Sequence, residues 1–295
     1  MKLIADSIKV SGMFRNYSPR QITPLVAFRF LFQFPREVRG DIVNILKGVR
    51  YFSNEQVLTL VKTEVVKSIE SFLLARIPAA NIIVAPANMV GTSSNFVFEG
   101  VREAIGSEFP GVQFHLNGPS EARKFTSLKN GAAVIFLDDF VGTGDQFLKS
   151  FRAWSDALGG RGARFVLIAA VACEEGKEKI EDKGALVQAP VIHTRGERLW
   201  QYCHENVGED QMKRFAVLAC ELRTTQPFGH RNGGSMVVLS RNRPNNVSIL
   251  FRGTDGQRIW YGLFPRSDQL VAKPFEEAVK RVDWSKSMRP AMFEL

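Results

Sequence analysis

The first eighty residues carry apolar positions at the three- and four-residue spacing of amphipathic helices. The segment TPLVAFRFLFQF, residues 23–34, places Pro24 at a helix start, where proline is well tolerated, and Pro35 follows its end. A second helix is expected within residues 36–49, and a third from Ser53, which opens a capping-box pattern, to about residue 76. The pattern predicts a helical N-terminal region over residues 1–80.

Short apolar runs alternate with helical segments from residue 81 to about residue 200. The runs that are typical of buried strands are 81–87, 112–116, 132–139, 164–173 and 185–194. Strands that alternate with helices favour a parallel sheet joined by right-handed crossovers. We therefore expect an α/β fold whose core, residues 81–200, is a mostly parallel five-stranded sheet.

The last ninety residues show a different pattern. Two short apolar runs, residues 234–240 and 246–253, are joined by the turn-rich stretch RNRPNN. Runs separated in this way are typical of an antiparallel pair. The expectation is that residues 201–295 form a small antiparallel C-terminal cap, or hood, packed on the core.

The composition is that of an ordinary soluble protein, with 45% apolar and 23% charged residues. No apolar run approaches the roughly 18–20 residues of a membrane-spanning helix, and the N-terminus does not resemble a secretory signal. Cys173, Cys203 and Cys220 lack metal-ligand spacing and are interpreted as thiols of a reducing compartment. These features predict a cytoplasmic protein with no membrane partner.

The formal net charge of +9 favours phosphate-bearing partners, either nucleotides or nucleic acid. A soluble basic protein without such a partner fits equally well, because the basic residues are spread along the chain and form no arm or tail. The charge alone leaves both interpretations open.

Two adjacent acids, Asp138 and Asp139, close the apolar run that begins at residue 132, and a Gly-Thr-Gly turn follows. Ligands of open parallel sheets bind beyond the carboxyl ends of the strands. Neighbouring strand residues point to opposite faces, so one acid is expected to reach a sugar hydroxyl or a hydrated Mg²⁺ while the other contacts the backbone or supporting groups. The turn leads into a helix, whose free N–H groups and dipole suit a phosphate. Together these features suit a ribose 5-phosphate.

The stretch VIFLDDFVGTGDQ, residues 134–146, resembles the 5-phosphoribosyl 1-pyrophosphate (PRPP) signature of type I phosphoribosyltransferases. The resemblance implies a sheet of phosphoribosyltransferase type, in which Asp138 and Asp139 hold the ribose hydroxyls, directly or through Mg²⁺. It also implies that a phosphate loop binds the 5′-phosphate, and the residues of that loop are Gly142, Thr143, Gly144, Asp145 and Gln146.

Two further loops follow from the resemblance by position. A pyrophosphate-binding loop is implied after the first strand, although a segment rich in Gly and Ser is more often an ordinary loop; its candidates are Gly91, Thr92, Ser93 and Ser94. A flexible loop is implied before the acidic strand, where Arg123 and Lys124 are candidates to close over pyrophosphate.

The phosphate loop departs from the family pattern at three positions. Gly142 stands where a hydroxyl residue is common, Gln146 stands where Thr is usual, and Asp145 adds a carboxylate. A carboxylate repels a dianionic phosphate unless it points outward or pairs with a metal. The sequence therefore leaves open whether PRPP itself is bound.

Short phrases from about residue 25 to residue 266, among them FRFLFQFP and WYGLFPR, are similar to the phosphoribosyltransferase-like proteins of bacterial conflict systems, including retron-associated effectors. The resemblance implies an antiphage effector that acts on nucleotides, nucleobases or PRPP at ribose C1, as a pentosyltransferase or as a toxic nucleotide N-glycosidase. Its implied partners are a nucleotide or PRPP-like small molecule, a reverse transcriptase with its RNA/DNA product, and a winged-helix DNA-binding protein. The alternative is a catalytically degenerate regulatory module that senses a nucleotide or binds nucleic acid.

Acceptor-binding candidates lie in the expected hood. They are Asn232, Asn245 and Asn246, with Phe228 or Trp260 available for stacking. Competing interpretations are that asparagine forms turns and that tryptophan packs in the core.

The histidines and cysteines give weaker signals. His115 and His193 fall near expected strand ends. Each of them either faces the site or is buried with its hydrogen bonds satisfied by the protein. Cys203 and His204 are adjacent on an expected helix, which is poor geometry for a shared metal ion, so no zinc site is expected.

Overall fold

The computed structural model describes residues 1–17, 21–88, 93–116, 131–158, 162–222, 227–229, 233–240, 247–253 and 260–264. The chain divides into two compact units. The sheet unit comprises residues 54–194, and the helical unit comprises residues 1–53 and 195–295. These boundaries differ from the expected ones at residues 80 and 200, because helix α4 (Asn54–Leu74) packs on the sheet and the C-terminal segment joins the first 53 residues.

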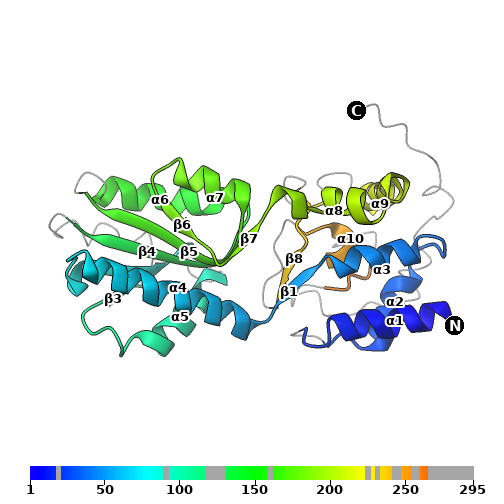
Figure 1. Ribbon diagram of the computed structural model, residues 1–295, viewed down its shortest axis with the longest axis horizontal. Helices are drawn as coiled ribbons and strands as arrows, with labels where there is room; N and C mark the ends of the chain where they lie inside the picture. Colours follow the sequence, from blue (N-terminus) through cyan, green and yellow to red (C-terminus); the bar gives the residue numbers. More distant parts are fainter. Residues whose placement is uncertain are drawn as a thin grey trace. The chain divides into compact units, whose positions relative to one another are not determined.

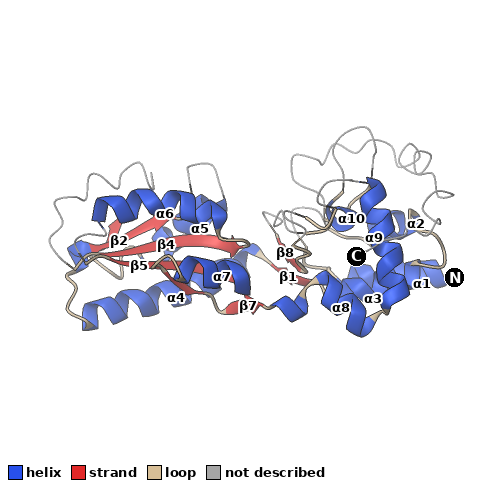
Figure 2. Ribbon diagram, turned by 90° about the horizontal axis from the view of Figure 1, so that it is seen from above, coloured by secondary structure: helices blue, strands red, loops and turns tan. Residues whose placement is uncertain are grey.

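The sheet unit is built on one parallel sheet (Figure 2). Its strands are β2 (Ile82–Pro86), β3 (Gln113–Phe114), β4 (Ala133–Val141), β5 (Arg164–Cys173), β6 (Leu186–Gln188) and β7 (Val191–His193). The order is β3-β2-β4-β5-β6, β7 also pairs with β5, and every pair is parallel. The α/β class with a mostly parallel sheet is confirmed. The sheet has six strands instead of five because the expected strand 185–194 is divided into β6 and β7.

The strand order reverses direction next to β2. The chain passes from β2 to β3 at one edge and then returns to place β4 on the other side of β2. In open α/β sheets, such a reversal leaves a crevice at the carboxyl ends of the two neighbouring strands. The sheet topology therefore places a potential site where β2 and β4 end.

Helices cover both faces of the sheet (Figure 1). Helices α4 and α5 (Ser93–Ile105) pack on one face, and α6 (Asp145–Leu158) and α7 (Glu174–Glu181) pack on the other. The central strands β4 and β5 are therefore buried on both sides, which explains why they are apolar almost throughout. No helix in the described ranges is long and apolar enough to cross a membrane.

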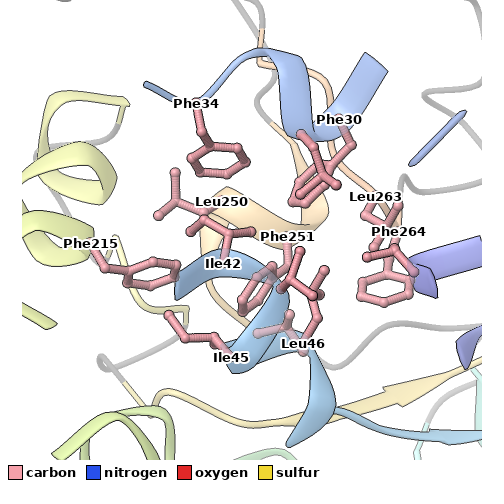
Figure 3. Close-up of a cluster of buried hydrophobic side chains, with 14 of the residues drawn as sticks. Phe30, Phe34, Ile42, Ile45, Leu46, Phe215, Leu250, Phe251, Leu263 and Phe264 are labelled. Atoms are coloured by element: carbon pink, nitrogen blue, oxygen red, sulfur yellow. The ribbon is translucent and has the colours of Figure 1, made fainter. Parts of the chain in front are cut away.

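The helical unit has its own apolar core. Its elements are α1 (Lys2–Met13), α2 (Pro24–Phe32), α3 (Arg39–Lys47), β1 (Arg50–Phe52), α8 (Leu199–Asn206), α9 (Glu209–Leu222), β8 (Val237–Leu239) and α10 (Ile249–Arg252). As expected, α2 begins at Pro24, and the Thr23 hydroxyl accepts a hydrogen bond from the Val26 N–H at 3.3 Å. Figure 3 shows aromatic and aliphatic side chains from both ends of the chain, including Phe30 and Phe264, in one cluster.

The expected antiparallel pair in the C-terminal segment is wrong. Strand β8 pairs in parallel with β1, so that Arg50 lies opposite Val237. The second expected strand instead contains the short helix α10, whose start is capped by the Ser248 hydroxyl. The pairing of β8 with a strand almost 190 positions earlier in the chain supplies the hydrogen bonds that a local hairpin would have supplied.

Phe136 offers a test of the sheet-unit core. Its fully buried ring lies 5.1 Å from that of Phe147, 5.8 Å from that of Trp154 and 6.4 Å from that of Phe165, measured between centroids. Phe136→Ala should lower the free energy of unfolding by about 3–5 kcal/mol in urea denaturation, because it opens a cavity. Phe136→Leu keeps most of the apolar volume and should cost less than half as much. Equal losses for the two variants would contradict this packing.

Candidate functional site

Asp138 and Asp139 lie inside strand β4, close to its carboxyl end. The strand continues to Val141 because its pairing with β5 continues, with Phe140 opposite Val171 and Val141 opposite Ala172. The strand is thus longer than expected, and each acid is only 7% exposed. Both carboxylates are buried at the end of the sheet where the crevice is expected.

Residues just after β2 and at the start of α5 contact the two acids. The Asp138 carboxylate accepts hydrogen bonds from the Ser94 hydroxyl at 2.9 Å, the Asn88 side-chain amide at 3.0 Å and the Asp139 backbone N–H at 3.0 Å. The Asp139 carboxylate accepts a hydrogen bond from the Ser93 hydroxyl at 2.9 Å. Neighbouring strand residues point to opposite faces, and yet both acids accept hydrogen bonds from side chains that flank the same connection, namely Asn88, Ser93 and Ser94.

The side-chain oxygen of Asn88 lacks a donor among the described residues. The residue is 5% exposed, and its amide nitrogen donates to Ser94 Oγ at 2.9 Å as well as to Asp138. Within the part of the chain that the structure describes, Asn88 Oδ1 has no hydrogen-bond partner. A buried acceptor without a donor costs about 1–3 kcal/mol, so this atom suits a ligand that brings a donor or a cation. The sequence analysis did not identify Asn88, although a polar residue just after a buried strand is a usable signal.

Burial and mutual repulsion make the acid pair hard to ionise. Burial raises the pKa of Asp138 well above its usual range, and the adjacent Asp139 carboxylate raises it further, while the hydrogen bond from Ser94 opposes the shift. Burial also raises the pKa of Asp139, and the hydrogen bond from Ser93 opposes that shift. The two carboxylates offer more hydrogen-bond acceptors than donors, and a bound proton, cation or hydroxyl group would each reduce this imbalance.

The residues present fit a hard divalent cation. Carboxylate and amide oxygens are the ligands that Mg²⁺ prefers, usually completed by water or substrate oxygens. Among the described residues, no three or more His, Cys, Asp or Glu side chains gather in a group that could hold a metal ion. A cation at this site would therefore rely on the acid pair, on Asn88 Oδ1 and on oxygens that are not from protein side chains.

The predicted phosphate loop, residues 142–146, packs closely against α7. Gly144 has a φ of +76°, which favours glycine, and its carbonyl accepts the Leu148 N–H at 3.0 Å as α6 begins. A Cβ on Gly176 would lie 2.1 Å from the Gly142 carbonyl oxygen. Side chains at these positions would displace the loop, so the close approach of loop and helix requires glycine.

Asp145 is paired within the protein. Its carboxylate accepts a hydrogen bond from Thr143 Oγ1 at 2.8 Å and forms an ion pair with Lys179 of α7. Gln146 is exposed. The sequence analysis did not identify Lys179, because nothing in the charged stretch EEGKEKIE separates it from Lys177, which pairs with Glu181.

Several sequence candidates lie outside the described residues. They are Gly91 and Thr92 of the pyrophosphate loop, Arg123 and Lys124 of the flexible loop, and Asn232, Asn245 and Asn246 of the hood. The other two pyrophosphate-loop candidates, Ser93 and Ser94, form the first turn of α5 and donate to the acid pair.

The aromatic hood candidates pack in the core of the helical unit. Trp260 is 3% exposed, donates from Nε1 to the Leu250 carbonyl at 2.9 Å and contacts the Phe34 ring edge-on. Phe228 is also buried, and its ring contacts that of Trp200. The core interpretation of Trp260 is confirmed, and Phe228, a candidate for stacking only, is buried as well.

The histidine and cysteine candidates are dispersed. His115 follows the edge strand β3 and contacts Gln113, and His193 is buried at the end of β7. Cys203 is buried while the adjacent His204 is exposed, and burial raises the pKa of the Cys203 thiol to about 12. Cys203 and His204 therefore lie in different environments although they are adjacent in the sequence.

Comparison with known proteins gives a family match over most of the chain. The model of the PRTase-CE family matches residues 28–266. No curated protein matches the chain. Among solved structures, the AQ2163 protein from Aquifex aeolicus is similar at 16% identity with a TM-score of 0.29. That match covers 40% of this chain and 58% of the AQ2163 protein, less than two thirds of its length, and so low a TM-score supports no further inference.

The raised pKa of Asp138 predicts a pH-dependent stability effect. A raised pKa means that the folded state holds the proton more tightly, so burial of Asp138 costs stability as pH rises above the unfolded value near 3.8. Asp138→Asn should therefore raise the thermal midpoint at pH 7.5, and the gain should vanish below about pH 4.

Asp156→Asn is the matched control, because Asp156 is an exposed acid on α6. This substitution should leave the thermal midpoint nearly unchanged at both pH values. If Asp138→Asn had a lower thermal midpoint than the wild-type protein at pH 7.5, or an equal gain at both pH values, the raised pKa of Asp138 would be contradicted.

Proposed function

Because this chain belongs to the PRTase-CE family, we propose that its acid pair binds a ribose and that the protein catalyses substitution at ribose C1. The substrate is a nucleotide or a PRPP-like small molecule. The observation that carries the proposal is the buried pair Asp138–Asp139, joined to Asn88 at the reversal of strand order. These acceptors complement the hydroxyl protons of a sugar.

The proposed chemistry takes one of two balanced forms. In transfer, the bond from C1 to a pyrophosphate oxygen breaks and pyrophosphate leaves, a bond from C1 to a base nitrogen forms, and the proton of that nitrogen passes to pyrophosphate or solvent. In cleavage, the bond from C1 to the base nitrogen breaks and a bond from C1 to a water oxygen forms. One proton of the water stays on the new C1 hydroxyl, and the other passes to the departing base or to solvent. Both forms pass through a sugar with positive charge at C1, which nearby carboxylates stabilise.

The roles of the protein's own residues follow from this scheme. Asp138 and Asp139 hold the ribose hydroxyls and fix the ring relative to the incoming group, which lowers the entropic cost of reaching the transition state. Asn88 adds a further acceptor, and Ser93 and Ser94 orient the two carboxylates. When bound, Mg²⁺ would neutralise charge on a leaving phosphate.

We further propose a role in bacterial antiphage defence of the retron type, with cytoplasmic localisation. The similarity of several sequence phrases to conflict-system proteins supports this role, and cleavage of nucleotides would be toxic to an infected cell. The proposed macromolecular partners are a reverse transcriptase with its RNA/DNA product and a winged-helix DNA-binding protein, and the net charge of +9 is compatible with a nucleic-acid partner.

Metabolite profiling by mass spectrometry tests the proposed activity. Cells expressing the chain with its neighbouring genes should lose a nucleotide or accumulate a free base after phage infection. The double variant Asp138→Asn/Asp139→Asn should reduce that change by at least about 10²-fold, the usual cost of removing charge stabilisation from an active site. Asp156→Asn should retain full activity.

Thermal unfolding of each purified variant separates loss of activity from loss of the fold. A double variant that is folded and fully active would contradict the role of the acid pair. An unchanged metabolite profile in cells with the wild-type protein would favour the alternative of a nucleotide-sensing or nucleic-acid-binding regulatory module.

A further inference from the structure

The positive charge of the chain is concentrated in one of its two units. The helical unit, residues 1–53 and 195–295, contains 25 of the 39 lysine and arginine residues and 14 of the 30 acidic residues, which gives a formal net charge of +11. The sheet unit has 14 basic and 16 acidic residues and therefore carries a charge of −2. The unit that contains the acid pair thus has no basic excess, and the excess belongs to a different surface.

The basic residues of the helical unit are mostly arginine. Arginine accounts for 18 of the 25 basic residues there, compared with 6 of the 14 in the sheet unit. The planar guanidinium group binds phosphate oxygens in pairs and also stacks on flat rings, whereas lysine acts as a point charge. The composition therefore favours a partner that offers both phosphates and bases over a surface that is merely anionic.

Several of these basic side chains gather around the start of α3. Helix α1 packs against α3, and Lys2 Nζ lies 3.9 Å from the position of a Cβ on Gly40. Burial raises the pKa of Asp41, and the positive charges of Arg214, from α9, and Lys2 oppose that shift. Arg39 is the first residue of α3. Three helices therefore bring positive charge to one place.

Arg36 joins the same group from the turn before α3. Burial lowers the pKa of Arg39, Glu37 opposes the shift, and the positive charge of Arg36 adds to it. The four basic residues are called the α3 basic cluster below: Lys2, Arg36, Arg39 and Arg214. With Glu37 and Asp41 beside them, the cluster keeps a positive balance, and three of its members, Lys2, Arg36 and Arg214, are exposed.

An exposed aromatic ring lies beside the cluster. Phe32, at the end of α2, is 40% exposed, and its ring is stacked with that of Phe28 at 5.7 Å between centroids. The Arg39 guanidinium lies 5.3 Å from the centroid of the Phe32 ring. Its Nη2 and Nε donate to the carbonyls of Phe32 and Phe34 at 3.1 and 2.9 Å, and these uncharged acceptors fix the guanidinium without cancelling its charge. An aromatic ring and a guanidinium group are the two kinds of flat surface on which proteins stack unpaired bases.

We infer that the α3 basic cluster and Phe32 bind single-stranded nucleic acid, with the basic side chains on the phosphates and the ring against a base. The observations favour a single strand, because the bases of a duplex are already stacked on one another and do not reach a ring on a protein surface. The inference assigns a surface to the nucleic-acid partner proposed above. It does not depend on the ribose chemistry of the acid pair.

Fluorescence anisotropy of labelled oligonucleotides on the full chain tests the inference. The probes are an oligothymidylate and an oligouridylate of about 20 nucleotides, long enough to fill one site, and they distinguish DNA from RNA as the preferred strand. The affinity of the wild-type protein for at least one strand should fall with salt. A plot of log affinity against log salt should have a slope of about −3, since each phosphate neutralised on a single strand contributes about −0.7.

Two variants separate the charges from the ring. Lys2→Gln/Arg36→Gln/Arg214→Gln changes three exposed residues, so it should fold normally, weaken binding by at least about tenfold at physiological salt and make the slope shallower by about 2. Phe32→Leu keeps an apolar side chain and removes the ring. It should weaken binding by about fivefold or more and leave the slope unchanged, because stacking releases no counterions.

The matched control removes the same charge from the sheet unit. Lys149→Gln/Arg152→Gln/Lys183→Gln also changes three exposed basic residues, and it should alter the affinity less than twofold. Thermal unfolding of every variant shows that losses of binding do not come from misfolding.

Four results would overturn the inference. They are no binding of either strand by the wild-type protein, an equal loss in the control variant, equally tight binding of a duplex of the same length, and unchanged binding by Phe32→Leu. Tighter binding to vesicles that contain phosphatidylserine than to either strand, lost in the helical-unit triple variant, would identify a lipid surface instead and would also overturn it.

The acid pair separates failure of this inference from failure of the proposed function. Asp138→Asn/Asp139→Asn should bind the strand within about twofold of the wild-type protein, because these acids lie in the sheet unit. The helical-unit triple variant and the acid-pair variant therefore fail in different assays: strand binding is lost in the first, and nucleotide turnover in the second. Loss of strand binding in the acid-pair variant would contradict the assignment to the helical unit.

Discussion

Two carboxylates buried next to each other impose the strongest constraint on this protein. Asp138 and Asp139 lie on the central strand β4, where helices cover both faces of the sheet and solvent cannot screen their charges. The fold accommodates them by placing β2 beside β4, so that Asn88, Ser93 and Ser94 deliver donors to both acids. The same placement of β2 beside β4 therefore determines both the strand order and the contacts of the acid pair.

In that arrangement, the acceptors outnumber the donors that the described residues provide. Asn88 Oδ1 lacks a donor, and burial raises the pKa of both acids. Active sites commonly retain such unfavourable features because the ligand relieves them. The phosphate loop has the opposite character, since Asp145, Thr143 and Lys179 satisfy one another without a ligand.

The sequence predicted what depends on local pattern. The strand positions, the start of α2 at Pro24 and the acid pair before a glycine-rich turn all follow from short-range spacing. It failed where distant segments decide the outcome, as in the parallel pairing of β1 with β8. Asn88 and Lys179 belong to the same class, because their partners become apparent only once the strand order and the position of α7 are known.

We propose that the acid pair and Asn88 form a set of oxygen ligands for a cation and a sugar. Titration with Mn²⁺, followed by electron paramagnetic resonance, measures this most directly, since Mn²⁺ favours the same oxygen ligands as Mg²⁺. The account predicts saturable binding of about one ion per chain. Binding should be lost in Asp138→Asn and weakened in Asn88→Ala. Absence of saturable binding at millimolar Mn²⁺, or equal binding by both variants and the wild-type protein, would contradict it.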